Sequence, residues 1–149
     1  MDPRSLTRDF SEFLQCLNAH AVEYLVVGGH AVAYHGYPRA TSDLDVWVAV
    51  NPTNAYRLAT ALRQFGFDVP DLTPELFLRP DRIVRMGIPP NRIEIQTGID
   101  GVDFQACEPR GVAADLGGVS VRFISLADLK ANKKASGRNK DLADLDHLP

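Results

Sequence analysis

Apolar residues recur at spacings of three and four over residues 6–17, a pattern that predicts an amphipathic helix with one face on the core. Terminal signals predict further helices. Asn51 and Pro52 suit the N-cap and first helical position of a helix that ends at Gly66, and Ser125 to Asp128 fit a capping box. The expected helical segments are residues 6–17, 30–35, 51–66, 104–107, 125–137 and 141–148.

Short runs of apolar, β-branched and aromatic residues between these segments predict strands. The first run stops at Gly28-Gly29, so the helix at 30–35 is expected to begin directly after this glycine pair. Two later runs flank Ile88 to Asn91, whose two prolines suit the turn of a hairpin. The expected strands are residues 23–27, 43–50, 82–87, 92–97 and 119–124. This order predicts one α/β (α+β) domain over residues 1–149, with a single mixed sheet and flanking helices.

Composition narrows the class of protein without indicating its chemistry. The chain has 149 residues, 45% of them apolar and 23% charged, which suits one globular domain with its own core. A formal net charge of −3 argues against a protein that coats nucleic acid by bulk attraction. No apolar run is long enough to span a membrane, Met1 to Arg4 lead into no signal-like segment, and the two cysteines are too few for a disulfide framework. We therefore expect a cytoplasmic protein with no membrane partner.

The first candidate chemistry is a pair of carboxylates at the start of a predicted strand. Side chains two residues apart project from the same face of a strand, so Asp43 and Asp45 are expected to point together. At roughly 5 Å and an effective dielectric constant of about 20, two such charges repel by about 3 kcal/mol. A cation relieves that repulsion, and hard oxygen ligands suit Mg²⁺ or Mn²⁺. The alternative is two solvated carboxylates on an exposed edge.

A third carboxylate strengthens the metal-site hypothesis. Two isoleucines take one face of the strand at 92–97, so Glu94 takes the other. If this strand lies beside the strand of Asp43 and Asp45, the three side chains form one site. The alternative is a surface glutamate paired with Arg82 or Arg92, and the glycine pair has its own plain alternative, a tight turn between strand and helix.

These features together resemble a known family. A strand that ends in a glycine pair, an Asp-Leu-Asp run thirteen residues later and a third carboxylate on a later strand are similar to the nucleotidyltransferase superfamily that includes DNA polymerase β. The closer likeness is to small bacterial nucleotidyltransferases, including those of abortive-infection and toxin–antitoxin systems. It extends over Glu23 to Leu148, and the runs with counterparts are Tyr24 to Ala31, Arg39 to Asp45, Ile124 to Leu129 and Lys140 to Leu145.

The resemblance implies roles for these residues. Asp43 and Asp45 would hold two metal ions, and Glu94 would hold one of them and orient the attacking hydroxyl. Aspartate is more usual at the third position, so the longer arm of Glu94 could weaken its role as a base or shift the metal. The nucleotide-binding set implied by the likeness is Gly28, Gly29, His30, Arg39, Thr41, Ser42 and Lys133. For His30 a hydrogen-bonded position at the helix start is the stronger alternative, and for Lys133 a solvated helix face.

The expected function is Mg²⁺-dependent transfer of a nucleoside monophosphate from an NTP such as ATP to an acceptor hydroxyl. The acceptor is RNA such as tRNA, a protein or a small molecule, and the resemblance implies a toxin–antitoxin or phage-defence setting. A group of arginines could guide an RNA; it comprises Arg79, Arg82, Arg85 and Arg92. The alternatives are a non-catalytic interaction module that keeps the fold and, with less support, a metal-dependent phosphate hydrolase.

Overall fold

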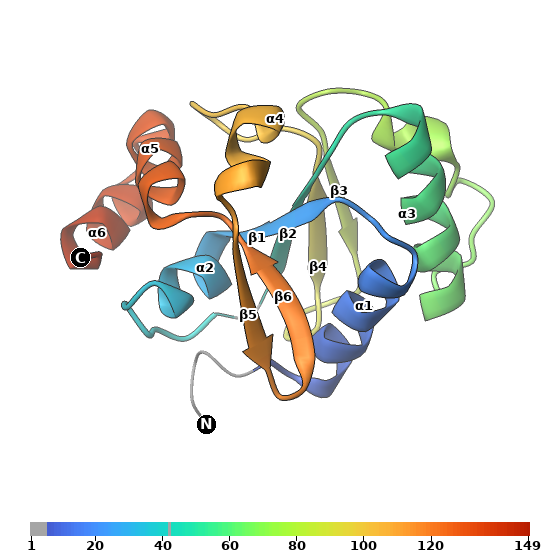
Figure 1. Cartoon of the computed structure of the whole chain (residues 1–149), viewed down its shortest axis with the longest axis horizontal. Coiled ribbons are helices and arrows are strands. Elements are labelled where there is room, and N and C mark those ends of the chain that lie inside the picture. Colours follow the sequence, from blue (N-terminus) through green and yellow to red (C-terminus); the bar gives the residue numbers. More distant parts are fainter. Residues whose placement is uncertain (1–5, 42) are drawn as a thin grey trace.

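The computed structural model describes residues 6–41 and 43–149, which form one mixed sheet with helices on both faces (Figure 1). The N-terminal residues 1–4 and the predicted phosphate contact Ser42 lie outside the described residues. The sheet has six strands in the order β3-β4-β2-β1-β6-β5. Their bounds are β1 Tyr24–Val27, β2 Leu44–Val48, β3 Ile83–Met86, β4 Ile93–Gln96, β5 Val112–Leu116 and β6 Val119–Phe123.

Two pairs of strands that are distant in sequence make the centre of the sheet. Strand β2 pairs with β1 in antiparallel fashion and with β4 in parallel fashion, and β1 pairs in parallel with β6. Hairpin partners complete the edges, because β3 pairs with β4 and β5 with β6. The single mixed sheet expected from the sequence is confirmed.

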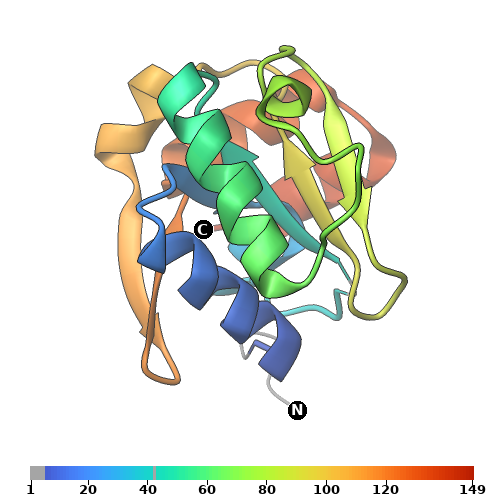
Figure 2. The same cartoon turned by 90° about the vertical axis from the view of Figure 1, so that its right-hand side faces the viewer.

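Helices cover the two faces of the sheet. Figure 2 shows α1 (Arg8–Ala19) and α3 (Pro52–Phe65) side by side in front of it, with the helices α5 and α6 behind it. The remaining helices are α2 Gly28–Tyr34, α4 Phe104–Cys107, α5 Leu126–Ser136, α6 Asn139–His147 and the 3-10 turns η1 Pro74–Phe77 and η2 Glu108–Arg110. None of the helices in the described part of the chain is long and apolar enough to cross a membrane.

The helix caps follow the local signals in the sequence. The side chains of Thr7, Asn51 and Ser125 accept hydrogen bonds from the backbone of the first turns of α1, α3 and α5, and so satisfy N–H groups that lack helical partners. Helix α5 stops at Gly137, whose φ of 65° is a left-handed conformation that glycine adopts without strain. The four apolar residues of the predicted stripe on α1 are all buried: Phe10, Phe13, Leu14 and Leu17.

Two sequence expectations about local structure were wrong. Helix α2 begins at Gly28 itself and not after the glycine pair, because Val27 already has the extended conformation of an N-cap. Strand β5 was not expected, since Val112 to Leu116 contain two alanines and an aspartate, which have low strand propensity. Gly117 and Gly118, with φ of 63° and 90°, form the tight turn that returns β5 to β6.

Buried Asn54 joins three segments beside the central strands. Its Oδ1 accepts a hydrogen bond from the Glu23 N–H at 2.7 Å, and its Nδ2 donates to the carbonyls of Glu23 and Ala49 at 3.1 and 2.8 Å. The side chain therefore holds the start of α3 against the strand ends that enter and leave the sheet.

We expect Asn54→Ala to lower the free energy of unfolding by about 2–4 kcal/mol, because buried backbone groups of Glu23 and Ala49 lose their partners. Urea denaturation followed by circular dichroism measures the change. Thr53→Ala, at an exposed neighbouring position of α3, serves as the control and should change stability by less than about 0.5 kcal/mol. Equal effects of the two substitutions would contradict the role given to Asn54.

Candidate active site

The glycine pair lies where β1 passes into α2, next to Asp45 of β2. Val27 is the register partner of Asp45, so the turn that follows Val27 lies against the Asp45 side chain. Gly28 has a φ of 66°, and a Cβ at this position would overlap the Asp45 carboxylate. A Cβ at Gly29 would likewise collide with the Thr41 side chain. Glycine at both positions lets two polar side chains approach the backbone closely.

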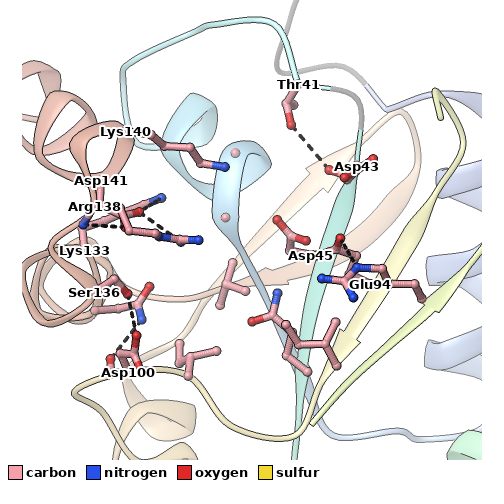
Figure 3. A pocket seen from close by; sticks show the side chains of 18 of the residues that line it. Thr41, Asp43, Asp45, Glu94, Asp100, Lys133, Ser136, Arg138, Lys140 and Asp141 are labelled. Atoms are coloured by element: carbon pink, nitrogen blue, oxygen red, sulfur yellow. Dashed lines mark hydrogen bonds and ion pairs between the residues drawn. The ribbon is translucent and has the colours of Figure 1, made fainter. Parts of the chain in front are cut away.

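Three carboxylates meet beside this turn. Asp45 on β2 and Glu94 on β4 are direct register partners in the parallel pair, and Asp43 immediately precedes β2. Figure 3 shows the three side chains together on one side of a cavity. The prediction that the strand of Glu94 lies beside the strand of Asp45 is therefore confirmed, and the alternating residues Leu44 and Val46 are buried on the opposite face.

Asp45 is the most perturbed acid of this group. Burial, together with the hydrogen bond to Glu94 and repulsion from Glu94 and Asp43, raises the pKa of Asp45 to about 7. Its Oδ1 atom is buried without a hydrogen-bond partner in the described part of the structure. Desolvation and the two neighbouring carboxylates therefore outweigh the positive charge of Lys140, which acts in the opposite direction.

Two arginines neutralise the other two carboxylates. The Arg92 guanidinium lies 2.7 Å from Asp43 Oδ2 and 3.6 Å from Glu94 Oε1, and Arg85 Nε lies 3.1 Å from Glu94 Oε1. The alternative for Glu94 was a surface ion pair with Arg82 or Arg92. Arg92 does lie within ion-pair distance of Glu94, but Arg85, which was not considered, lies closer. With the arginines in these positions, residues 6–41 and 43–149 contain no group of three His, Cys, Asp or Glu side chains arranged to hold a metal ion.

The opposite wall of the cavity is a buried network of ion pairs between α5, α6 and the segment before β2. Lys133 Nζ lies 3.1 Å from both Asp141 Oδ1 and Asp144 Oδ2, and its side chain is only 5% exposed. Arg39 binds Asp144 through two hydrogen bonds of 2.9 and 3.0 Å. The solvated helix face considered for Lys133 is therefore wrong, and both Lys133 and Arg39 have carboxylate partners.

The two aspartates of this network are firmly ionised. Burial alone would raise the pKa of Asp141 and of Asp144, but hydrogen bonds from Arg138, Arg39 and Lys133 outweigh it and hold both below the usual range. Their negative charge in turn fixes the position of the cations. Asp141 pairs with Lys133, whereas Arg39 pairs with Asp144.

Lys140 is a functional candidate that sequence reasoning underrated. Figure 3 shows its side chain extending from α6 into the cavity, toward the side where the carboxylates lie. Lys140 makes no ion pair with residues 6–41 or 43–149, and its charge lowers the pKa of Asp45. The sequence around Lys140 does not indicate that its side chain enters the cavity, because the turn between α5 and α6 decides where this side chain points.

The cavity has a volume of about 730 Å³ and gathers most of the predicted site. The predicted residues that line it are Gly28, Gly29, Arg39, Thr41, Asp43, Asp45, Glu94 and Lys133. His30 is not among the lining residues. Its ring packs edge-on against Phe10 at 5.6 Å, burial lowers its pKa to about 4, and its Nε2 has no hydrogen-bond partner among the described residues. The role of His30 as a nucleotide contact and the alternative of a hydrogen-bonded residue at the helix start both stay predictions.

Comparison with solved structures identifies the fold. A protein from Thermotoga maritima (TM1012), which carries a provisional assignment as a nucleotidyltransferase, superposes with a TM-score of 0.59 at 16% identity over 95% of this chain and 94% of its own. An antigenic nucleotidyltransferase-like protein from Paracoccidioides brasiliensis superposes with a TM-score of 0.54 at 20% identity over 92% of this chain and 72% of its own. No protein-family model and no curated protein matches the sequence. The chain has the nucleotidyltransferase fold, as its sequence predicted.

The raised pKa of Asp45 makes stability depend on pH in a defined direction. An unfolded chain loses the Asp45 proton near pH 4, whereas the folded protein keeps it to about pH 7. Between these values the folded state binds more protons, so this group lowers the free energy of unfolding as pH rises, and the penalty is complete above about pH 7. We expect Asp45→Asn to be more stable than the parent by about 1–3 kcal/mol near pH 8, with the gain vanishing near pH 4.

Urea denaturation in EDTA across this pH range measures the difference between the two proteins. Taking the difference cancels groups that both proteins share, such as His30, whose lowered pKa acts in the opposite direction at acid pH. A stability difference that does not change with pH would contradict the assignment.

Proposed function

We propose that this protein is a nucleotidyltransferase that uses Mg²⁺ to transfer a nucleoside monophosphate from an NTP to an acceptor hydroxyl. The observation that carries the proposal is the half-buried Asp45 carboxylate, which lies beside Glu94, has a buried Oδ1 without a hydrogen-bond partner among the described residues, and faces a wall of cations across the cavity. Structural neighbours with nucleotidyltransferase names support the same reaction class.

The donor set fits a hard divalent cation. Asp45 and Glu94 offer carboxylate oxygens, and the raised pKa of Asp45 reports an uncompensated negative potential where such a cation would bind. Asp43 would join them once Arg92, which now lies against it, moves aside. When bound, Mg²⁺ would supply Lewis-acid stabilisation of charge on the oxygens around the α-phosphorus.

The side chains and backbone of this chain have separate tasks in the proposed reaction. The turn at Gly28 and Gly29 lets a phosphate approach the backbone, because no Cβ blocks it. Lys140 and Arg138 would hold the β- and γ-phosphates, and Glu94 would orient the acceptor hydroxyl and accept its proton. The acceptor oxygen then forms a bond to the α-phosphorus while the bond to the β-phosphate oxygen breaks, and pyrophosphate leaves.

The buried cations have a positioning task in this scheme. Arg39 and Lys133 line the cavity, but Asp144 and Asp141 hold them, so each contributes a fixed positive charge. A fixed charge stabilises developing negative charge without rearranging during the reaction. We keep both residues in the proposed nucleotide-binding set on this basis.

The acceptor is proposed from surface charge and from the family resemblance. Arg79 and Arg82 are exposed near the β3 edge, and Arg85 adjoins the cavity, which suits a polyanion such as tRNA. A protein partner or a small molecule is the alternative acceptor. A role in a toxin–antitoxin or phage-defence system, and a cytoplasmic location, belong to the same proposal.

One observation favours a second candidate function, a non-catalytic interaction module. Arg92 and Arg85 already neutralise Asp43 and Glu94, as expected of a site that has exchanged its metal for ion pairs. The two predictions below separate this candidate from the enzyme.

We expect the purified protein, incubated with α-labelled NTP, Mg²⁺ and RNA and protein from its host, to label one class of acceptor and release pyrophosphate. Asp45→Asn should reduce labelling at least about a hundredfold, because it removes a metal-binding carboxylate. Asp146→Asn, at an exposed site on α6, is the matched control and should retain activity. Label that moves only from the γ-phosphate would indicate a different reaction, and no transfer with any NTP would favour the interaction module.

We expect Arg92→Met to raise the affinity for Mn²⁺ about tenfold, because the substitution removes a positive charge that competes for Asp43. Electron paramagnetic resonance of free Mn²⁺ measures the affinity without nucleotide. Arg82→Met, which removes an exposed charge just before β3, should leave it unchanged. Affinity for Mn²⁺ that is absent in both the parent and Arg92→Met would contradict the metal site.

A further inference from the structure

The cavity has two chemically different ends on either side of the carboxylates. Cations gather at the α5–α6 end, where Arg138 and Lys140 stand in front of the buried Lys133. The other end extends over β3 and β4, where Ile83 and Gln96 line it, while Figure 3 shows Asp100 beside Ser136 on the facing α5 side. Because polyphosphate is highly charged, it would take the cationic end and leave the second end for the rest of the nucleotide.

The floor of the second end is a shelf of one amide and one apolar side chain on adjacent strands. Gln96 and Ile83 are register partners in the β3–β4 pair, and both line the cavity. Gln96 follows Glu94 by two residues on the same face of β4, so the shelf begins roughly 7 Å from the carboxylates. That separation is about what a ribose spans between an α-phosphate and its base.

The shelf has a rigid neighbour on the same face of the sheet. Trp47 is the register partner of Gln96 on β2, is 1% exposed and packs edge-on against Phe104 at 5.1 Å. Ile83 is 47% exposed, although it belongs to a strand and lines a cavity. An exposed apolar side chain next to this rigid part of the sheet offers a flat contact for an aromatic ring.

Hydrogen-bonding groups around the shelf favour a base with an exocyclic amine. The Gln96 amide has no hydrogen-bond partner within residues 6–41 and 43–149, so its donor and acceptor are available. Asp81 lies against Gly98 at this end, and Asp100 lines the facing α5 side of the cavity; both side chains can only accept hydrogen bonds when ionised. Asp100 is held in place, because Ser136 Oγ donates to its Oδ2 at 3.1 Å and Asn132 donates to its carbonyl at 2.9 Å.

We infer that this shelf, formed by Ile83 and Gln96 with Asp81 beside them, binds the nucleobase of the NTP and that Gln96 selects adenine. The Gln96 Oε1 accepts a hydrogen bond from the adenine amine while its Nε2 donates to a ring nitrogen, the paired contact that an amide makes with adenine. A base that carries a carbonyl oxygen in place of the amine would place this oxygen near carboxylates and would leave Gln96 Oε1 without a hydrogen-bond donor. The inference rests on the proposed function.

Calorimetric titration with Mg²⁺ and three probes separates the inference from its premise. Binding of tripolyphosphate measures the affinity of the cationic end alone. ATP and inosine triphosphate differ in their base, because adenine carries an amine where hypoxanthine carries a carbonyl oxygen. We expect ATP to bind at least about tenfold more tightly than inosine triphosphate and more tightly than tripolyphosphate. Equal binding of ATP and inosine triphosphate, or of ATP and tripolyphosphate, would overturn the nucleobase site and leave the proposed function standing. Failure of all three probes to bind would overturn both.

Substitutions at the shelf test the assignment to particular residues. Gln96→Met keeps the side-chain length and removes both hydrogen bonds, so the preference for ATP over inosine triphosphate should fall to about twofold or less while tripolyphosphate binding is unchanged. Ile83→Asn should weaken both nucleoside triphosphates and spare tripolyphosphate. Ile88→Asn, at a 79% exposed isoleucine in the β3–β4 turn, is its matched control and should change none of them. A thermal melt of each variant establishes that it is folded, and an undiminished ATP preference in folded Gln96→Met would overturn the role of Gln96.

Discussion

The parallel pairing of β2 with β4 places the Asp45 carboxylate directly beside that of Glu94, and the organisation of the site depends on this pairing. Packing of Leu44, Val46, Ile93 and Ile95 on the opposite, buried face fixes the register, so neither acid can turn away without moving a strand. The like charges therefore remain together, and the surrounding structure has to compensate them. Arg92 and Arg85 do so for Asp43 and Glu94, while Asp45 responds with a raised pKa.

In the second wall of the cavity, formed by Arg39 and the helices α5 and α6, the buried charged side chains are paired with one another. There every buried charge has a partner, since Lys133 contacts two aspartates and Arg39 forms a two-point contact with Asp144. A buried ion network is weak support for stability as such, because desolvation offsets much of the attraction between its members. The network holds positive charge at one fixed place, facing Asp45, the acid of the other wall that forms no ion pair within residues 6–41 and 43–149. The cavity thus combines fully paired buried charges on one wall with Asp45, whose Oδ1 has no hydrogen-bond partner among the described residues, on the other. This combination marks the cavity as the candidate site.

The sequence was most informative where one residue pattern decides the outcome. Alternation of side chains along a strand put Asp43 and Asp45 together and Glu94 on the face opposite its isoleucines, and the helix with its cap at Asn51 and its end at Gly66 was predicted to the residue. The predicted site of three carboxylates required the strand of Glu94 to lie next to β2. The sequence pattern of one strand could not establish this, because strand order is a property of the whole sheet. The resemblance to nucleotidyltransferases made the condition reasonable, and the structure confirmed it.

The missed features depend on contacts between distant residues. Arg39 and Asp144 are 105 positions apart, so no local pattern indicated that the predicted phosphate ligand would be bound to a carboxylate. Lys133 was predicted as a phosphate contact, and its burial against two aspartates was not anticipated for the same reason. The angle between α5 and α6 decides which lysine, Lys133 or Lys140, extends into the cavity. Strand β5 was missed because its pairing with β6 overrides the low strand propensity of its alanines.

The contact between Arg39 and Asp144 also has a consequence for biosynthesis. Residues 6–41 can leave the ribosome and begin to fold long before α6 has been translated, yet the positive wall needs the aspartates of Asn139–His147 to hold Arg39 and Lys133 in place. On a nascent chain the carboxylates of β2 and β4 would face an incomplete partner surface. The assembled cavity therefore forms only when α6 docks against the earlier segments.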